Sequence, residues 1–341
     1  MTNCGLRQNY AGHCYGAAIY NGPNSTTLVS RCLFGGNEAV GASASMGGAA
    51  IKHEGQMLAI FDSAFIRTRL ALGGNCPRAT GGAIQSLEPL VVQGCYFGGN
   101  QANNGGALAL YGDATIVNSV FSGNYAVASG ATFWATGHGG ALAILSYRPR
   151  QITLQGVTIV GNDAAEDAGG IYFRGTVGPE PPLVENSILW SNRSNNGQLA
   201  RFQEQVHGAV DLRYDDIEEL IAGIPGEDPP QCTACLDADP LFVRGSAQDG
   251  LVGTVDDHLR LATGSPVLDA PGNAGFVGVT TDLDGGARFV DDPATVGTGQ
   301  GTPPVADMGA YEFRSGLAVG RHRRRHRRQP TRRWWGLRRQ R

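Results

Sequence analysis

Carboxylates are the side chains of this sequence with the clearest capacity for chemistry. A glycoside hydrolase places two or three of them across a cleft, and a polysaccharide lyase gathers several around Ca²⁺ beside a basic residue. The repeats described below contain one acidic pair, Asp215-Asp216, which is followed by Glu218-Glu219. The remaining acids of the repeats do not recur at equivalent positions. We interpret the pair as a solvated edge that leads into a loop, and we predict no catalytic residues.

Four aspartates near the C-terminus form Asp-x-Asp pairs, namely Asp237 with Asp239 and Asp282 with Asp284. Calcium takes six to eight oxygen ligands, and loops of this kind supply them. The same pairs are also common turn formers, because an aspartate side chain can bond to its own backbone. A calcium site and a set of turns are therefore both open interpretations. No other cofactor is predicted.

Phe133, Trp134 and His138 lie in a long insertion between two repeats. Aromatic side chains at such an edge could stack on sugar rings, which would make them a ligand-binding site. They could equally cover the edge of the core. A surface polysaccharide is the partner that this interpretation implies.

Seven cysteines are present, so at least one has no partner within the chain. Cys32 and Cys95 occupy the same place in their repeats, and we interpret them as small buried residues that stack with Ser63, Ser119 and Ser187. Cys232-x-x-Cys235 allows a local disulfide, two free thiols or a metal site. Zinc normally requires a second pair of cysteines or histidines, which the sequence does not offer.

The elements that must position these residues belong to a repeat. Gly105-Gly106-Ala107-Leu108 leads to Phe121-Ser-Gly-Asn124, and the same pattern recurs about six times; the spacings Gly82 to Gly106 and Asn100 to Asn124 are both 24 residues. A period in the twenties indicates a solenoid. Each repeat has short runs of alternating apolar residues, which predict strands. We expect an all-β, right-handed parallel β-helix; a leucine-rich repeat is the alternative.

An asparagine ends the second run of most repeats. We predict a structural ladder in which these asparagines take the left-handed turn conformation and bond to one another from coil to coil. The predicted ladder comprises Asn37, Asn100, Asn124, Asn162 and Asn192.

These motifs resemble those of two groups of surface proteins. Gly-Gly-Ala-(Ile/Leu) followed by Phe-x-x-Asn, over about residues 1–215, resembles the repeats of polymorphic outer-membrane proteins and the broader pectin-lyase-like β-helix class. Residues 236–313 contain Asp237-Ala-Asp-Pro, Gly264-Ser-Pro, Thr281-Asp-Leu-Asp-Gly and Asp307-Met-Gly-Ala-Tyr-Glu-Phe, in the order found in choice-of-anchor β-helix proteins. The resemblance implies an exported surface protein and no known reaction.

The sequence thus predicts four regions. Residues 1–218 form the β-helix of about seven coils, beginning inside a coil; 219–235 form a loop; 236–313 form an irregular β cap; and 314–341 form a disordered basic tail. Residues 1–320 hold 16 Lys and Arg against 30 Asp and Glu, a net charge of −14, which argues against nucleic acid as a partner. Residues 321–341 of the tail hold 11 arginines, and a reading-frame error is an alternative explanation for them.

We expect a monomeric, non-catalytic protein at the cell surface, acting as a stalk or an adhesin-like binding module. No transmembrane segment is predicted, and a signal peptide is missing from the first residues, so we expect a longer natural protein. The alternative is a carbohydrate-active enzyme. An enzyme should hold at least three polar, convergent, ionisable side chains from neighbouring coils, and such a cluster on the coils of residues 81–190 would overturn the non-catalytic expectation.

Overall fold

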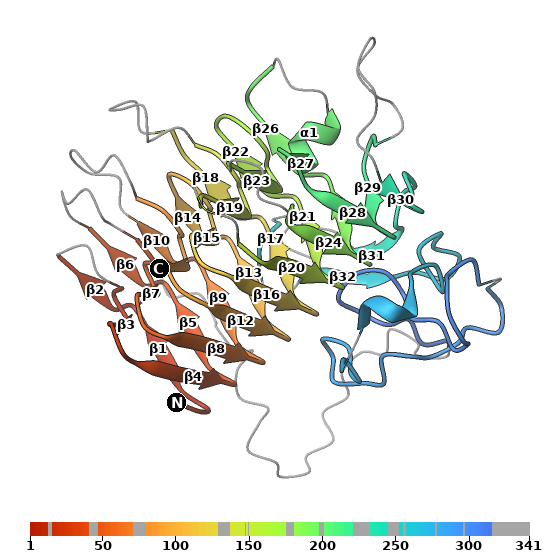
Figure 1. The fold of residues 1–341 in the computed structure, drawn as a ribbon, viewed down its shortest axis with the longest axis horizontal. Helices are drawn as coiled ribbons and strands as arrows, with labels where there is room; N and C mark the ends of the chain where they lie inside the picture. The colour runs from red at the N-terminus through yellow and green to blue at the C-terminus, as the bar shows by residue number, and fades with distance from the viewer. Residues whose placement is uncertain are drawn as a thin grey trace.

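The computed structural model shows a solenoid with an irregular block beside it (Figure 1). It describes residues 1–12, 16–40, 47–70, 79–128, 137–146, 148, 150–174, 181–197, 201–220, 232–244, 252–254, 257–276, 278–295 and 297–315. Phe133, Trp134 and the tail beyond residue 315 lie outside these ranges. The predictions made for them are therefore not addressed by the structure.

Four parallel sheets run along the solenoid, and each complete coil contributes one strand to each of them. Sheet I contains β3 (Ile19–Asn21), β7 (Ile51–His53), β11 (Ile84–Ser86), β15 (Leu108–Leu110), β19 (Leu142–Ile144), β23 (Ile171–Phe173) and β27 (Val206–His207). Sheet II contains β4 (Thr26–Ser30), β8 (Met57–Phe61), β12 (Leu90–Gln93), β16 (Ala114–Val117), β20 (Ile152–Gln155), β24 (Leu183–Glu185), β28 (Asp211–Arg213) and β30 (Cys232–Thr233).

Sheets III and IV complete each coil. Sheet III contains β1 (Gly5–Arg7), β5 (Leu33–Gly35), β9 (Ala64–Ile66), β13 (Tyr96–Gly98), β17 (Val120–Ser122), β21 (Thr158–Val160), β25 (Ile188–Trp190) and β29 (Asp216–Ile217). Sheet IV contains β2 (Tyr10–Ala11), β6 (Glu38–Ala39), β10 (Arg69–Leu70), β14 (Gln101–Ala102), β18 (Tyr125–Ala126), β22 (Asp163–Ala164) and β26 (Arg193–Ser194). This confirms the right-handed parallel β-helix. The leucine-rich-repeat alternative is wrong, because each coil carries four strands.

Alternating residues of each strand fill the interior. In sheet III the rings of Phe34, Phe65, Phe97 and Phe121 stack nearly parallel, with centroids 4.5, 4.9 and 4.7 Å apart, and all four are fully buried. These distances match the spacing of hydrogen-bonded strands, about 4.8 Å, so the backbone ladder sets the spacing of the aromatic column. The core is therefore continuous from coil to coil.

The asparagine ladder lies at the turn between sheets III and IV. Asn124 Oδ1 accepts hydrogen bonds from the backbone N–H of Asn100 at 3.0 Å and from Asn100 Nδ2 at 2.9 Å, and Asn124 Nδ2 donates to Asn162 Oδ1 at 2.8 Å. The same contacts join Asn9 to Asn37 and Asn162 to Asn192. Thr68 takes the asparagine position in one coil and bonds to Asn100. Gln205 accepts from Asn192 at the far end.

The predicted left-handed conformation of these asparagines is wrong. The residue before each of them has positive φ instead: Gly36 (φ 61°), Gly99 (φ 61°), Gly123 (φ 59°), Gly161 (φ 63°) and Ser191 (φ 54°). The preceding residue turns the chain on the outside, and this directs the asparagine side chain inward, where its amide meets its neighbours.

A second column of inward side chains lies at the turn between sheets II and III. Cys32 N donates to Ser63 Oγ at 3.0 Å, and Cys95 N donates to Ser119 Oγ at 3.1 Å. Burial raises the pKa of the Cys95 thiol to about 12. Cys32 and Cys95 are thus buried members of this serine stack. Asp215 occupies the same place one coil after Ser187 and is fully buried, as is Asp216. The prediction of a solvated edge is wrong.

The solenoid continues past the predicted boundary at residue 218. Cys232 and Thr233 pair with β28, Ala234 has positive φ, and Leu236 forms a bridge to Asp216. These residues were predicted to lie in a loop or at the start of the cap, but they form a further partial coil. Only after them does the chain leave the solenoid.

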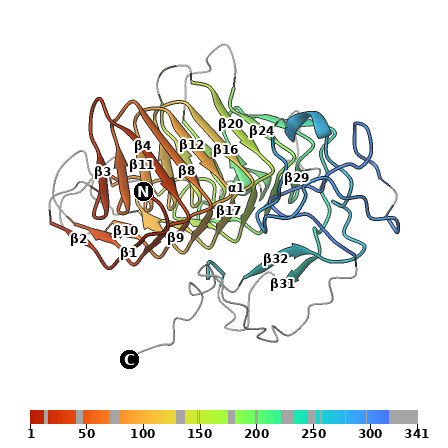
Figure 2. The same ribbon diagram turned by 90° about the horizontal axis from the view of Figure 1, so that it is seen from below.

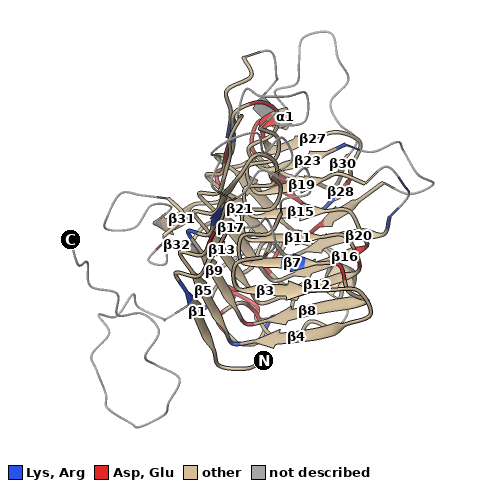
Figure 3. Ribbon diagram, turned by 90° about the vertical axis from the view of Figure 1, so that its left-hand side faces the viewer, with Lys and Arg blue, Asp and Glu red and all other residues tan. Residues whose placement is uncertain are grey.

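The described residues of 237–313, here named the C-terminal block, pack against the outside of sheet III rather than over the end of the solenoid. The block contains the antiparallel pair β31 (Phe242–Arg244) and β32 (His258–Leu261), and the 3₁₀ helix η1 (Asn273–Phe276). Figure 2 shows β31 and β32 below the stack of coils, and Figure 3, seen from the N-terminal end, shows them beside β13, β17 and β21. The expected cap is thus a lateral support.

Hydrogen bonds anchor the block at several coils. Ser122 Oγ donates to Asp257 Oδ2 at 2.8 Å, and Ala310 N donates to Thr158 Oγ1 at 2.9 Å. Asn186 exchanges two hydrogen bonds with the backbone of Gly272, both at 2.9 Å. An apolar cluster that includes Ile188, Val267 and Met308 fills the space between the block and the last coils. The two parts therefore form one folded unit.

Buried carboxylates inside the block make its stability depend on pH. Burial raises the pKa of Glu312 to about 9, with the neighbouring Asp307 adding to the rise, and burial raises the pKa of Asp307 to about 7. The folded state therefore binds protons more tightly than the unfolded chain. This proton binding stabilises the fold fully below about pH 4, and the stabilisation is lost as pH rises through the folded-state pKa values of about 7 and about 9. We expect the free energy of unfolding to fall between pH 6 and pH 9, because both carboxyls ionise in the folded state over this range.

Denaturant midpoints at a series of pH values check this expectation. Glu312→Gln is the informative variant, because it removes one titrating group. The variant should be less stable overall, since its amide nitrogen faces the N–H of Asp307 or Val290, but its midpoint should change less with pH. A wild-type midpoint that does not fall between pH 6 and pH 9 would contradict the prediction.

The described part of the chain contains no helix of sufficient length and hydrophobicity to span a membrane.

Candidate functional site

The face of sheet I that points away from the core carries a row of side chains, one from each coil, and the members from Lys52 to Tyr172 are buried. The strand register aligns them in the order Tyr20, Lys52, Gln85, Ala109, Ala143, Tyr172 and His207. Small alanines occupy the middle of the row, and aromatic rings occupy its C-terminal end. The row follows from the alternation of the strands, since the residues on either side of each member point into the core.

Three rings stack at the C-terminal end of this face, and we name them the ring row: His138, Tyr172 and His207. The rings of His138 and Tyr172 lie 4.3 Å apart at an angle of 10°, and those of Tyr172 and His207 lie 5.5 Å apart at 22°. His138 comes from the turn before β19, whereas Tyr172 and His207 come from β23 and β27. The coil repeat thus brings together three residues that are widely separated in the sequence.

His138 also contacts a carboxylate. Its Nδ1 lies 3.2 Å from Asp167 Oδ2 and accepts a hydrogen bond from the backbone N–H of Asp167, with the two nitrogens 3.2 Å apart. Asp167 Oδ1 in turn accepts from Asn196 Nδ2 at 2.8 Å. Burial lowers the pKa of His138 to about 4, although Asp167 opposes this shift. The imidazole is therefore neutral near pH 7, and its Nε2 has no hydrogen-bond partner among the described residues.

The stacking of the three rings decides how they can bind a ligand. One face of His138 is covered by Tyr172, and the faces of Tyr172 are covered by both histidines. The side chain of His138 is 14% exposed and Tyr172 is 9% exposed. A sugar ring would meet ring edges here, which carry nitrogen and hydroxyl groups. Hydrogen bonding, rather than the predicted ring stacking, is thus what His138 can contribute.

No family model matches the chain. No curated protein matches it either.

The ring row brings ionisable side chains together, but the two histidines lie on opposite faces of Tyr172 and His207 lies beyond residues 81–190, so the cluster expected of an enzyme is not complete. His138, Asp167 and His207 are ionisable and come from three successive coils on one face, and the charges of His207 and Arg174 act on His138. Of these residues, sequence analysis identified only His138. Asp167 could have been found by aligning the repeats on their strands, which places it directly after His138 in the column that also contains Asn104.

The four predicted calcium ligands have other partners. Asp237 accepts from the backbone N–H of Glu219 and Asp239 from that of Leu241, each at 2.9 Å. Asp282 is buried and accepts from the N–H of Gly286 and from Arg314, whereas Asp284 forms an ion pair with Arg260.

No three of these four aspartates, all within the described residues, offer oxygens within 4.8 Å of one another. The structure gives them the roles of turn formers and ion-pair partners. The residues whose ligand atoms do lie that close are Asp215, Cys232 and Cys235, which are considered below.

Proposed function

We propose that this protein is an exported, non-catalytic cell-surface β-helix whose ring row binds a polysaccharide. The observation that carries the proposal is the alignment of His138, Tyr172 and His207 on one face of successive coils. The stacked coils hold these edges at the strand spacing of about 4.8 Å. A polymer with hydroxyl groups along its length offers donors and acceptors that repeat in the same way.

The fold supports the binding role physically. The backbone amides and inward side chains of the coils are already bonded to their neighbours, as at Asn124 and Asn162, so the outward face is held rigidly. A rigid site loses little conformational entropy when a ligand binds. Hydrogen-bonding groups that surround the ring row include Asn104, Asp167 and Asn196. These groups suit a hydroxyl-rich ligand better than an apolar one.

Two further observations support export to the surface. The disulfide between Cys232 and Cys235 is the form expected in an oxidising compartment. The motifs of residues 236–313 resemble those of choice-of-anchor surface proteins, and the repeats resemble those of polymorphic outer-membrane proteins. Both resemblances concern proteins that reach the cell surface.

His138→Ala tests the binding site. We expect affinity for the bound polysaccharide to fall at least about tenfold, because the substitution removes the free Nε2 and one end of the ring stack. Binding would be measured on a panel of neutral and uronic-acid polysaccharides, with purified full-length chain. Thr115→Ala, an exposed change on sheet II, is the control. Equal affinity of His138→Ala and wild type for a polysaccharide that binds would remove the ring row from the proposal.

A carbohydrate-active enzyme is the second candidate, and the His138–Asp167 contact favours it. If Nδ1 exchanged its bond from the Asp167 N–H for a proton of its own donated to Asp167 Oδ2, Nε2 would be left as a base with a depressed pKa. Such a base could abstract a proton from a polyuronate or activate a water molecule. Turnover of any polysaccharide in the panel that is lost in His138→Ala would replace the non-catalytic proposal. Binding without turnover would retain it.

A further inference from the structure

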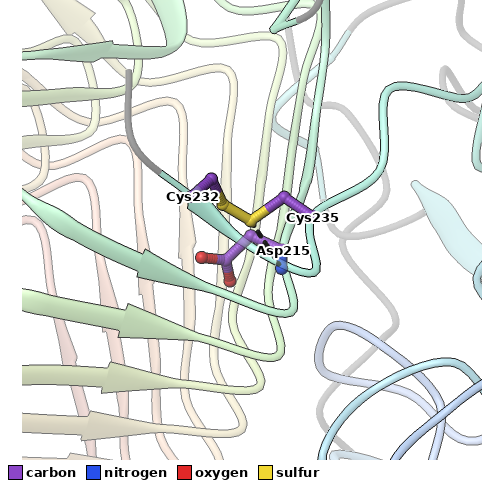
Figure 4. Close-up of side chains that lie close together, drawn as sticks. All are labelled: Asp215, Cys232 and Cys235. Atoms are coloured by element: carbon purple, nitrogen blue, oxygen red, sulfur yellow. Dashed lines mark hydrogen bonds between the residues drawn. A yellow bond between two sulfur atoms is a disulfide. The ribbon is translucent and has the colours of Figure 1, made fainter. Parts of the chain in front are cut away.

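The turn between sheets II and III ends in an unusual group of side chains. Most members of its inward column are cysteine or serine, but Asp215 follows Ser187, and Cys235 follows Asp215. Cys235 Sγ accepts the backbone N–H of Asp215 at 3.4 Å, and Cys232 lies beside it on β30 (Figure 4). The two sulfurs and a carboxylate oxygen all lie within 4.8 Å of one another. In the structure the sulfurs form a disulfide.

The carboxylate of Asp215 exceeds what its place in the column requires. Each position must supply one acceptor for a backbone N–H of the preceding coil, and the hydroxyls of Ser63, Ser119 and Ser187 do so. Asp215 supplies Oδ1 to Ser187 N at 2.8 Å and Oδ2 to Arg213 N at 3.0 Å. It is fully buried, and no Lys, Arg or His among the described residues forms an ion pair with it.

A buried carboxylate without a countercharge is costly. A divalent cation bound by the two adjacent sulfurs would supply the missing positive charge. Two thiolates and one carboxylate are a ligand set that suits Zn²⁺, which binds sulfur at about 2.3 Å and oxygen at about 2.0–2.2 Å. Tetrahedral geometry at these bond lengths separates the sulfurs by about 3.8 Å. Opening the disulfide permits that separation, and a carboxylate oxygen of Asp215 already lies within 4.8 Å of both sulfurs.

We propose that Cys232, Cys235 and Asp215 bind one zinc-class divalent cation when the disulfide is reduced. Two equivalents of a low-molecular-weight thiol reduce the disulfide, giving two cysteine thiols and one disulfide formed from the two small thiols. Each cysteine thiol then releases its proton to solvent as its sulfur binds the metal. Three protein ligands leave a fourth position for water. The disulfide and the metal are thus alternative ways of linking Cys232 to Cys235 in the last coil.

Metal titration of the reduced full-length chain tests the proposal. The chain would be reduced with a phosphine, freed of reductant without oxygen, and titrated with Co²⁺ as a spectroscopic substitute for Zn²⁺. We expect one equivalent to bind with thiolate-to-cobalt absorption, and Zn²⁺ to displace it. The oxidised chain should not show this binding.

Three variants separate this site from other thiols. Cys235→Ser should abolish the absorption. Asp215→Ser restores the residue found at equivalent positions of the column, so it keeps the acceptor for Ser187 N while removing the carboxylate, and it should weaken binding at least tenfold. Cys95→Ser, in the same column, should bind as the wild type does. Absence of binding in the reduced chain, or unchanged binding in Cys235→Ser, would overturn the proposal. Unchanged affinity in Asp215→Ser would remove the carboxylate from it.

Discussion

Replacing Asn124 with alanine should destabilise the solenoid by roughly 3–5 kcal/mol, because four hydrogen bonds meet at one fully buried side chain. Asn124 Oδ1 accepts two of them from Asn100, and Nδ2 donates the other two to Phe97 O and Asn162 Oδ1. Alanine leaves the backbone N–H of Asn100 buried without an acceptor. The denaturant midpoint of the purified chain measures the loss.

Two further substitutions make this measurement specific. Asn124→Thr should cost less than Asn124→Ala, since Thr68 shows that a hydroxyl can take this place and bond to the next coil. Thr115→Ala, exposed in the same coil, should change the midpoint little. If Asn124→Ala and Thr115→Ala shift the midpoint equally, the side-chain ladder contributes nothing to stability.

Gly123→Ala should detach the C-terminal block from the solenoid, at a total cost of about 3 kcal/mol or more. Part of this cost is the left-handed backbone, with φ of 59°. The rest is a collision, because an added Cβ would clash with the carbonyl oxygen of Val252 and would lie 2.6 Å from Gly253 Cα. We expect Trp190, which packs against the block, to become more exposed and to shift its fluorescence to longer wavelength.

Gly36→Ala is the matched control for this experiment. Gly36 occupies the same position of an earlier coil with φ of 61°, but the atom nearest to its added Cβ is Gln8 Cγ at 3.8 Å. It therefore carries the same backbone strain without the collision. Gly123→Ala should lower the unfolding midpoint further than Gly36→Ala does. Equal losses in the two variants would show that residues 252–253 do not dock here.

Much of the fold was predictable because each coil repeats the same physical solution. Phe34, Phe97 and Phe121 recur at one place in the pattern, and this period defines the inward column of sheet III. The conformation of the ladder asparagines was predicted wrongly because sequence shows which residues recur but not which of two neighbours turns the chain. Gly123 and Asn124 are both capable of positive φ, and the need to direct an amide inward decides between them.

The candidate site was harder to predict, for a reason visible in its own repeat. In one coil Gly139-Gly140 is followed by Ala141 and then by Leu142, the first residue of β19. In the next coil Gly169-Gly170 is followed directly by Ile171, the residue that pairs with Leu142. The glycine pair is therefore displaced by one residue relative to the strand. Alignment on the glycines therefore places Ala168, rather than Asp167, beside His138. Ala168 in fact takes the left-handed place of Gly139, with φ of 55° against 68°.

Asp215 was misjudged for a similar reason. Asp215 lies in the serine column between Ser187 and Cys235, and the further partial coil that contains Cys235 lies next to it. A carboxylate next to another carboxylate is most often solvated, and composition alone gave no sign of burial. The docking of residues 252–310 along sheet III could not be predicted either, because it joins segments that share no repeat.

The C-terminal block limits how the number of repeats can change during evolution. The block contacts the solenoid from Tyr96 on β13 to Asn186, just before β25, and Ile188 on β25, so it spans a fixed number of coils. Duplication or loss of a repeat inside that interval would displace one anchor from the other by about 4.8 Å. Repeats that precede β13 carry none of these anchors. We expect related genes to vary in copy number before the segment that encodes Tyr96 and to keep it constant after, which a comparison of their repeat counts would check.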